Sequence, residues 1–307
     1  MRIKKHFFIH IGNHKTGTTS LQHFLFNKKN LLYKKKILYI VANSSVNHHN
    51  ISWQAIKHFY FDKNKQTVDT LIKEISLNKN YNILISSENL ENLKFSNQFN
   101  KFIINIKKNH NIKIVWAIRE QFSYSLSLLS MLLNKGAYLK NFDLFIDSIL
   151  KKGKFNFKPY TFWFDYYEQY KNICKTFKVN KKNILLITYS KKQNIFEEFC
   201  KKLSIKIRVN KNFYYKNVSK SLFQNDKNIK NWIKNIINYK KNFFNKSITN
   251  DKSLFFYINK KKKFFFSKKD ILIKKIIVKN YFKNSNLKLF KTFRVSQKKI
   301  RDFYNEY

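Results

Sequence analysis

The 307-residue sequence has only two cysteines, one proline, four glycines and 17 acidic residues. Cys174 and Cys200 form at most one disulfide, so bridges do not hold this fold together and a reducing compartment is expected. The sequence lacks a window of ~18 uncharged apolar residues that would span a membrane. The apolar run near the N-terminus is too short for a signal peptide. We therefore expect a soluble, cytoplasmic protein.

Basic residues are abundant: 63 Lys and Arg give a formal net charge of +46. Only five of them are Arg, and Lys, Asn, Ile, Phe and Tyr, which A/T-rich codons encode, fill much of the chain. Codon bias therefore accounts for most of the charge, although an anionic partner such as nucleic acid remains an alternative. In such a composition the few remaining glycines and arginines are the informative residues.

Apolar content of 43% is ample for a core. Short apolar runs alternate with amphipathic stretches over the first 120 residues, which is typical of an α/β fold. Strands are expected at Phe7–Ile11, Ile37–Val41, Asn82–Ile85, Ile112–Ile118 and Asn183–Thr188. Helices are expected at Thr18–Asn27, Trp53–Tyr60, Val68–Ser76, Phe99–Lys108, Gln121–Leu133, Phe142–Leu150, Thr161–Phe177 (after Pro159) and Ile195–Leu203. We predict a P-loop-like three-layer fold with a mostly parallel sheet of about five strands between helices.

The C-terminal part, residues 206–307, is mostly helical in pattern and contains Lys/Asn/Phe tracts at Asn238–Phe244 and Lys260–Lys269, which are expected to be surface loops or an insertion. Helices are expected at Asp270–Phe282 and Asn286–Phe293. The sequence shows no internal repeat and no Pro/Gly/Ser linker. We therefore expect one domain over 1–307, with an α/β nucleotide-binding core over about 1–205.

Two of the four glycines bracket the stretch Gly12-Asn-His-Lys-Thr-Gly17, which lies between an expected strand and an expected helix. Glycines let the backbone approach an anion, and the first N–H groups of the helix point at it. Thr18, Thr19 and Ser20 add hydroxyl donors. A strand-to-helix turn without a ligand is the alternative, but this whole string in a glycine-poor chain favours a phosphate-binding loop.

The ATP-binding version of such a loop has a lysine directly after its second glycine. Here that position is Thr18, and the lysine is Lys15, inside the loop. This difference counts against a kinase or another ordinary NTPase.

The string from His10 to Gln22 resembles the 5′-phosphosulfate-binding loop of sulfotransferases that use 3′-phosphoadenylyl sulfate (PAPS) and release 3′-phosphoadenosine 5′-phosphate (PAP). The resemblance implies that Lys15 reaches the bridging oxygen and the sulfuryl group. It also implies that the loop holds the 5′-phosphate through the remaining residues Asn13, His14, Thr16, Gly17, Thr18, Thr19 and Ser20.

The same family holds the 3′-phosphate with an Arg at the end of a later strand and a Ser eight residues on. Arg119 follows the expected strand Ile112–Ile118, and Ser127 lies eight residues after it. Guanidinium groups bind phosphate through two parallel hydrogen bonds, which lysine does not provide. Weaker likenesses lie at Asn183–Tyr189, Asn217–Ser219 and Asn284–Asn286. The resemblance is greatest to bacterial members that modify carbohydrates or cell surfaces.

A general base must take the proton from the acceptor. Glu88 is the first candidate, because it follows an expected strand at the edge where α/β folds bind ligands. A role limited to the start of the next helix is equally compatible with its position. His49 is the rival, with His48 and Glu91 as lesser candidates, and His14 is expected to contact the donor or acceptor. No metal-ligand cluster is evident, and none is needed.

We therefore expect a PAPS-dependent sulfotransferase that transfers a sulfuryl group to a hydroxyl or amine, with a glycan as the acceptor. The alternatives are a P-loop kinase or another nucleotide-dependent transferase, and a non-enzymatic polyanion-binding protein. Basic residues are spread along the chain without a nucleic-acid-binding module, which disfavours the last of these. Trp53, Trp163 and Tyr166 are candidates for stacking on a sugar, although core packing is the more common use of an aromatic ring.

Overall fold

The computed structural model describes residues 4–41, 45–134, 142–190, 194–206 and 268–305. The chain divides into two compact units. The first consists of Met1–Glu120, Lys154–Asn217 and Ser285–Tyr307, and the second of Gln121–Gly153 and Val218–Asn284. The expectation of one domain with a nucleotide-binding core stays a prediction.

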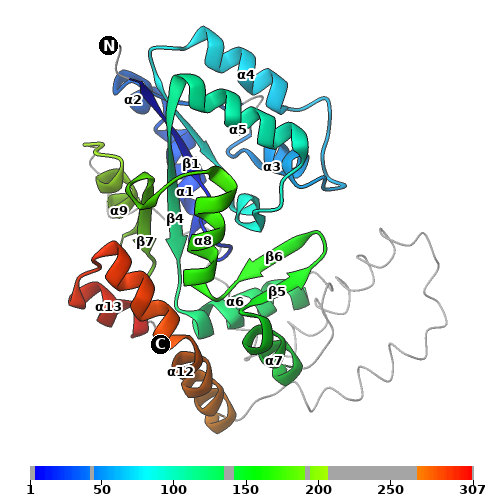
Figure 1. The fold of residues 1–307 in the computed structure, drawn as a ribbon, viewed down its shortest axis with the longest axis vertical. Helices are drawn as coiled ribbons and strands as arrows, with labels where there is room; N and C mark the ends of the chain where they lie inside the picture. The colour runs from blue at the N-terminus through cyan, green and yellow to red at the C-terminus, as the bar shows by residue number, and fades with distance from the viewer. Residues whose placement is uncertain (1–3, 42–44, 135–141, 191–193, 207–267, 306–307) are drawn as a thin grey trace, which may run out of the picture. The chain divides into compact units, whose positions relative to one another are not determined.

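A five-stranded parallel sheet forms the centre of the first unit (Figure 1). Its order is β2-β3-β1-β4-β7, and each neighbouring pair runs parallel. The strands are β1 (Lys5–His10), β2 (Ile37–Tyr39), β3 (Asn82–Ser86), β4 (His110–Ile118) and β7 (Ile184–Thr188). The predicted sheet is confirmed, so the carboxyl ends of all five strands lie along one edge, where α/β folds bind ligands.

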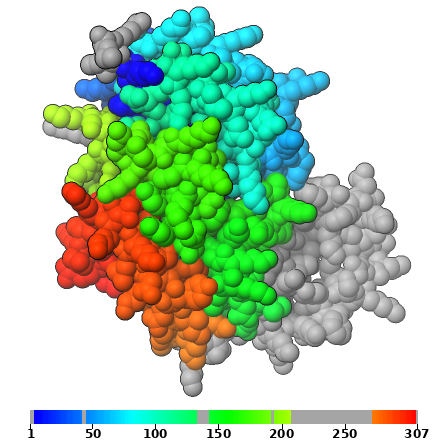
Figure 2. Space-filling model, in the orientation of Figure 1, coloured from blue at the N-terminus to red at the C-terminus, as the bar shows by residue number. Residues whose placement is uncertain are grey.

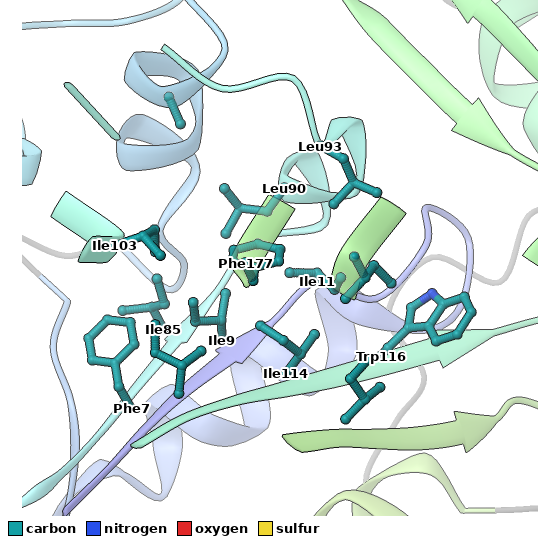
Figure 3. Close-up of a cluster of buried hydrophobic side chains, with 14 of the residues drawn as sticks. Phe7, Ile9, Ile11, Ile85, Leu90, Leu93, Ile103, Ile114, Trp116 and Phe177 are labelled. Atoms are coloured by element: carbon teal, nitrogen blue, oxygen red, sulfur yellow. The ribbon is translucent and has the colours of Figure 1, made fainter. Parts of the chain in front are cut away.

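The central strands are buried on both faces, as parallel sheets usually are. Side chains alternate between the faces: Phe7 and Ile9 of β1 belong to one apolar cluster, while Phe8 belongs to the other. Strand β4 alternates in the same way, with Trp116 in the first cluster and Val115 in the second. Figure 3 shows the first cluster, in which Phe7, Ile9, Ile114 and Trp116 lie among side chains from several elements.

Helices cover both faces of this sheet. The second cluster receives side chains from α1 (Thr18–Asn27), α2 (Lys29–Lys34) and α9 (Ile195–Lys202). The first receives them from α3 (His49–Ala55), α4 (Val68–Leu77), the 3₁₀ helix η1 (Glu88–Asn92), α5 (Asn97–Asn109), α8 (Tyr166–Phe177) and α13 (Gln297–Tyr304). A second 3₁₀ helix, η2 (Lys181–Asn183), precedes β7. The first unit therefore has the predicted three layers.

The C-terminal helices return to the first unit. The end of α12 (Lys268–Phe293) packs beside α8, where the rings of Tyr170 and Phe293 lie 5.4 Å apart. Ser285 Oγ accepts a hydrogen bond from the Tyr167 N–H at 3.3 Å. In Figure 2 the red C-terminal surface lies against the green surface that precedes it by more than 100 residues in the chain. The predicted helical C-terminal part is therefore present in the described residues.

The second unit contains α6 (Gln121–Asn134), α7 (Phe142–Lys152) and the first part of α12. The rings of Phe122 and Phe142 meet edge to face at 6.3 Å, which packs α6 against α7. An ion pair of 3.0 Å joins Lys274 of α12 to Asp143 of α7.

Several local expectations were wrong. Pro159 does not start a helix: it lies in the turn between β5 (Lys154–Phe157) and β6 (Tyr160–Trp163), an antiparallel hairpin. Helix α8 begins only after Asp165, whose carboxylate caps it by accepting from the Glu168 N–H at 3.0 Å.

Other boundaries also differ from the sequence-based expectations. The helix expected at Trp53–Tyr60 instead spans His49–Ala55, and the two expected C-terminal helices form the single helix α12. The short helices α2 and α13 were not expected. Asn217–Ser219, the tract Asn238–Phe244 and most of Lys260–Lys269 lie outside the described residues.

Candidate functional site

The candidate site residues of the first unit gather at the carboxyl edge of the sheet. The loop of residues 11–17 follows β1, and Ser87 and η1 follow β3. Arg119 follows β4, and Tyr189 follows β7. Four neighbouring strands thus deliver candidate residues to one edge, which is where ligands bind in open α/β sheets.

The two glycines of the loop are required by its geometry. A Cβ atom at Gly12 would lie 2.7 Å from His10 Nε2 and 3.0 Å from Thr18 Cγ2, so any side chain there would clash. Gly17 holds φ at 78°, in the left-handed region that other residues rarely adopt, and it directly precedes α1. The rare glycines therefore mark positions where no other residue fits well.

The N-terminus of α1 is suited to an anion. No side chain caps it through a hydrogen bond, and its first turn contains no acidic residue. The N–H groups in the first turn of any α-helix take no part in the hydrogen-bond ladder of that helix, which makes this position a common binding place for anions. Within the loop, Lys15 has φ of 64°, and Thr16 Oγ1 donates to the Asn13 carbonyl oxygen at 2.5 Å.

Asn13 anchors this loop from within the protein. Its buried amide donates to Gln169 Oε1 at 3.2 Å and accepts from Gln169 Nε2 at 2.9 Å. Its oxygen also accepts from Trp116 Nε1 at 3.1 Å, and its backbone N–H donates to the Ala117 carbonyl oxygen at 3.0 Å. The side chain is thus used in the interior. Sequence reasoning missed Gln169, because no spacing signal connects it with a loop 156 residues away.

Arg119 lies directly beside the loop. It is 9% exposed, and its Nη1 donates to the carbonyl oxygen of Lys15 at 3.0 Å. Its guanidinium also lies over the ring of Tyr189, 5.4 Å from the ring centre, and Tyr166 Oη donates to its carbonyl oxygen at 2.5 Å. Ser127 is half-buried on α6, in the second unit. Its predicted pairing with Arg119 stays a prediction.

A carboxylate and an imidazole meet at the end of β3. Glu88 Oε1 lies 3.6 Å from His49 Nε2, and Glu88 Oε2 accepts from Gln22 Nε2 at 2.8 Å. His49 Nδ1 is hydrogen-bonded to Ser87 Oγ at 2.8 Å, so both ring nitrogens have neighbours. Burial alone would raise the pKa of Glu88, but the positive charges of His49 and His14 outweigh it and leave that pKa below the ordinary 4.5. Glu88 is therefore ionised at neutral pH.

A second such pair joins the loop to η1. His14 Nδ1 is hydrogen-bonded to Glu91, whose carboxylate is almost completely buried. Burial raises the pKa of Glu91 above its ordinary value, although His14 acts in the opposite direction. The ring of His14 also lies edge to face against Phe162, at 5.1 Å.

His48 has a structural position. It is 2% exposed, and its Nδ1 accepts from the Ser86 N–H at 3.1 Å. Burial lowers its pKa to about 3, so it stays neutral. On the same serine, Ser86 Oγ is hydrogen-bonded to His10 Nδ1 at 2.7 Å, and burial lowers the pKa of His10 to about 4. These buried imidazoles hold β3 against its neighbours.

Aromatic rings continue outward from the Glu88 and His49 pair. The ring of Trp53 lies 5.8 Å from that of His49 and 5.5 Å from that of Tyr60. Phe59 and Tyr60 are 59% and 53% exposed. In contrast, Trp163 and Tyr166 are buried in the first apolar cluster, where they serve the core. Trp53, Phe59 and Tyr60 are called the aromatic platform below.

Comparisons with known proteins add one likeness. The fold aligns with a sulfotransferase from Alicyclobacillus acidocaldarius at 11% identity and a TM-score of 0.40, over 80% of this chain and 98% of the other. A likeness of this extent does not assign an activity. No family model matches the sequence, and no curated protein matches it.

Within the described part of the chain, no helix is long and apolar enough to cross a membrane. The same residues contain no group of three or more His, Cys, Asp or Glu side chains placed to hold a metal ion.

Proposed function

We propose that this protein is a sulfotransferase that moves a sulfuryl group from PAPS to a hydroxyl or amine of a glycan. The observation that carries the proposal is the phosphate-type loop at the start of α1, with Arg119 donating to the carbonyl oxygen of Lys15. The Glu88 carboxylate follows a neighbouring strand at the same edge. The proposed anion site and the carboxylate proposed as the general base are therefore at the same carboxyl edge of the sheet.

The residues present fit a nucleotide that carries phosphates at both ends of its ribose. The N-terminus of α1 suits the 5′-phosphate, because no side chain caps it through a hydrogen bond and its first turn contains no acidic residue. Arg119 supplies a guanidinium for the 3′-phosphate, with Ser127 as its proposed helper. When bound, PAPS supplies an activated sulfuryl group whose leaving group is a nucleotide phosphate.

The side chains of this site have separate tasks in the proposed reaction. Lys15 neutralises negative charge on the oxygen of the breaking sulfur–oxygen bond. The acceptor oxygen forms the new bond to sulfur in line with the bond that breaks, and its proton passes to a protein base. Asn13 and Gln169 keep the loop in position through their buried amide pair.

We assign the base to Glu88 and a supporting role to His49. The carboxylate of Glu88 is ionised and held in place by Gln22, so it is ready to accept a proton. His49 has Ser87 at one nitrogen and Glu88 at the other, which orients the imidazole toward the carboxylate. His14 is hydrogen-bonded to the buried Glu91 beside the loop, which holds its ring in place.

The aromatic platform supports a glycan as the acceptor. Sugar rings present apolar C–H faces that pack on exposed aromatic rings, and Phe59 and Tyr60 are exposed rings of this kind. Trp53 connects them to His49, so a sugar on the platform lies near the proposed base.

A nucleotide-binding experiment separates this proposal from a kinase. Isothermal titration is expected to give tight PAP binding, weak binding of ATP and of adenosine 5′-phosphate, and loss of PAP binding in Lys15→Ala. The exposed Lys73→Ala on α4 serves as the matched control and is expected to bind PAP normally. Equal affinity for PAP and adenosine 5′-phosphate contradicts the proposal, and ATP binding tighter than PAP favours the kinase.

Activity is then measured directly with PAPS carrying radioactive sulfur and a mixture of oligosaccharides. Label in the oligosaccharide fraction is expected from the wild-type protein and not from Lys15→Ala. Label on simple phenols but on no oligosaccharide would keep the sulfotransferase and overturn the glycan.

A further inference from the structure

The outer edge of the sheet at β7 borders a groove that the proposed reaction does not use. Strand β7 ends the described sheet, and its outer side pairs with no described strand. The groove beside it has a volume of about 570 Å³, within the range of ligand sites. Ile184, Leu186 and Thr188 of β7 line it, together with residues of η2, α9 and the turn from α12 to α13.

The register of β7 shows which of its backbone groups face this groove. Ile187 pairs with Ala117 of β4, and the Tyr189 N–H donates to the Ile118 carbonyl oxygen at 2.7 Å. Backbone groups of alternate residues point in the same direction along a strand. Ile187 and Tyr189 therefore face β4, whereas the N–H and C=O groups of Ile184, Leu186 and Thr188 face outward.

The same edge also leaves a side chain unsatisfied. Thr188 is 5% exposed, and its Oγ1 has no hydrogen-bond partner among the described residues. A buried hydroxyl normally has a partner. Thr188 is also one of the residues that line the groove.

Cationic residues lie on the elements around β7, and none lies on β7 itself. The sequence of β7, Ile-Leu-Leu-Ile-Thr, contains no charged residue. Lysine on the edge strand is one of the ways in which proteins protect an exposed edge, and here the lysines lie on the elements around it. The cationic lining residues are Lys181, Lys182, Lys202, Arg294 and Lys299, and none of the described residues that line the groove is acidic.

Lysine side chains lie close to one another at this groove. Lys299 is paired with Glu198 of α9, which also acts on the charge of Lys202. Burial and the neighbouring charge of Lys299 lower the pKa of Lys202 below its ordinary value. Arg294 is one of only five arginines, and it holds φ of 50°, which is uncommon for this residue type.

We propose that this groove binds an extended acidic peptide segment, which adds to the sheet as a sixth strand beside β7. The outward backbone groups of β7 supply the hydrogen-bond ladder, as in other cases of strand addition. The surrounding cations select acidic side chains on the incoming segment. Segments of this chain itself are poorly matched, because acidic residues are only 17 of 307.

The test uses the full-length protein and a labelled eight-residue peptide of alternating glutamate and valine, at a salt concentration that suppresses non-specific attraction. A second peptide has the same sequence but carries N-methyl groups on alternate backbone amides, which removes ladder donors and keeps the charge. Fluorescence anisotropy is expected to show at least tenfold weaker binding of the methylated peptide. Equal binding of both peptides, or equally tight binding of an oligothymidylate, overturns the proposal in favour of a general polyanion surface.

Charge reversal in the groove provides the second measurement. The double variant Lys182→Glu/Arg294→Glu is expected to weaken peptide binding at least tenfold. The matched control Lys73→Glu/Lys101→Glu makes the same charge change on exposed residues of α4 and α5 and is expected to stay within twofold. A control that weakens as much as the groove variant overturns the proposal.

Amide hydrogen exchange followed by NMR locates the peptide even if a variant fails to fold. Peptide binding to the wild-type protein is expected to slow exchange at Leu186 and Thr188, whose N–H groups face outward. Ile187, which faces β4, is expected to be slow with and without peptide. Unchanged exchange at Leu186 and Thr188 in the presence of saturating peptide rules out strand addition.

Discussion

The Nη1 atom of Arg119 donates a hydrogen bond to the carbonyl oxygen of Lys15 at 3.0 Å, which joins the end of β4 to the middle of the loop between β1 and α1. The two residues are 104 positions apart in the sequence, and Arg119 is one of only five arginines in the chain. The proposed site gives Arg119 two tasks, because the guanidinium that contacts the loop is also the group proposed to bind the 3′-phosphate.

Replacing Arg119 by Lys is expected to weaken PAP binding about tenfold or more, because lysine keeps the charge but loses the planar, two-point geometry. Binding of adenosine 5′-phosphate is expected to weaken less, since it lacks the 3′-phosphate. Isothermal titration with both nucleotides measures the difference. An equal loss for both would show that Arg119 acts only on the loop.

Gly17 allows a test of the loop backbone. Gly17→Ala is expected to destabilise the protein by about 1–2 kcal/mol, because φ of 78° is unfavourable for alanine. The space is adequate, since a Cβ there would meet Tyr189 Cε2 at an ordinary 3.4 Å, so the cost is one of backbone conformation. Gly17→Asn is the control: asparagine tolerates this region, and urea unfolding is expected to show a smaller loss. Equal losses would indicate a packing effect instead.

Much of the sheet could be predicted because its strands are short apolar runs buried on both faces. The run Ile114–Ile118 is apolar at every position, so it could be predicted as a buried strand without deciding which of its faces is buried. The hairpin β5–β6 could not be predicted in this way. Its strands have four residues each, and Tyr160 to Phe177 is apolar and aromatic often enough to fit a helical pattern.

The sequence indicates those parts of the candidate site whose residues are close together in the chain, and it does not indicate the parts whose residues are far apart. Gly12, Lys15 and Gly17 lie within one short stretch, and their spacing alone predicted a loop between a strand and a helix, which the structure contains; its ligand stays a prediction. Asn13 was expected to contact a ligand, but its side chain bonds Gln169 and Trp116, which depends on the packing of α8 and β4. Only three-dimensional structure brings such residues together.

Glu88→Gln is expected to lower kcat for sulfuryl transfer by about 10²–10⁴, because the amide cannot accept the proton. The lowered pKa of Glu88 sets the pH dependence of the activity. The carboxylate stays ionised as the pH falls from 7 to 5, and it becomes protonated only below pH 4.5, the ordinary pKa of a glutamate. Wild-type activity per folded molecule is therefore expected to persist to about pH 5. A decline centred near pH 6.5 would assign the base to an imidazole.

His49→Asn provides the control for this pH profile. It removes a positive charge that lowers the pKa of Glu88. The acidic limb of activity is therefore expected to move to higher pH, with part of the activity retained at pH 8. Complete loss of activity at pH 8 would instead make His49 the base.

Because His48 is buried, we expect the free energy of unfolding to fall in acid. Its pKa is about 3 in the folded protein and about 6.5 in the unfolded chain. The unfolded state therefore binds more protons, and stability is complete above about pH 6.5 and is lost as pH falls below it. Urea unfolding is expected to show a loss of about 2 kcal/mol from this residue between pH 6.5 and 5.

The variant His48→Asn tests that assignment, because an amide oxygen can accept from the Ser86 N–H without titrating. Its free energy of unfolding is expected to change less between pH 6.5 and 5 than that of the wild-type protein. His10, with a folded pKa of about 4, leaves a residual slope in the same window. An unchanged slope in the variant would show that other groups cause the acid sensitivity.

The amide pair of Asn13 and Gln169 is expected to behave as one unit. Asn13→Ala or Gln169→Ala leaves buried polar groups without partners, and each is expected to cost about 1–3 kcal/mol in urea unfolding. Once one amide has been removed, removing the other destabilises the protein less. The loss of unfolding free energy in the double variant is therefore expected to be about 0.5–3 kcal/mol smaller than the sum of the two single losses. Exposed Gln98→Ala is the control, with a change within about 0.5 kcal/mol. Additive losses would show that the pair is uncoupled, and the loop would then owe its position to Trp116 and the backbone of β4 alone.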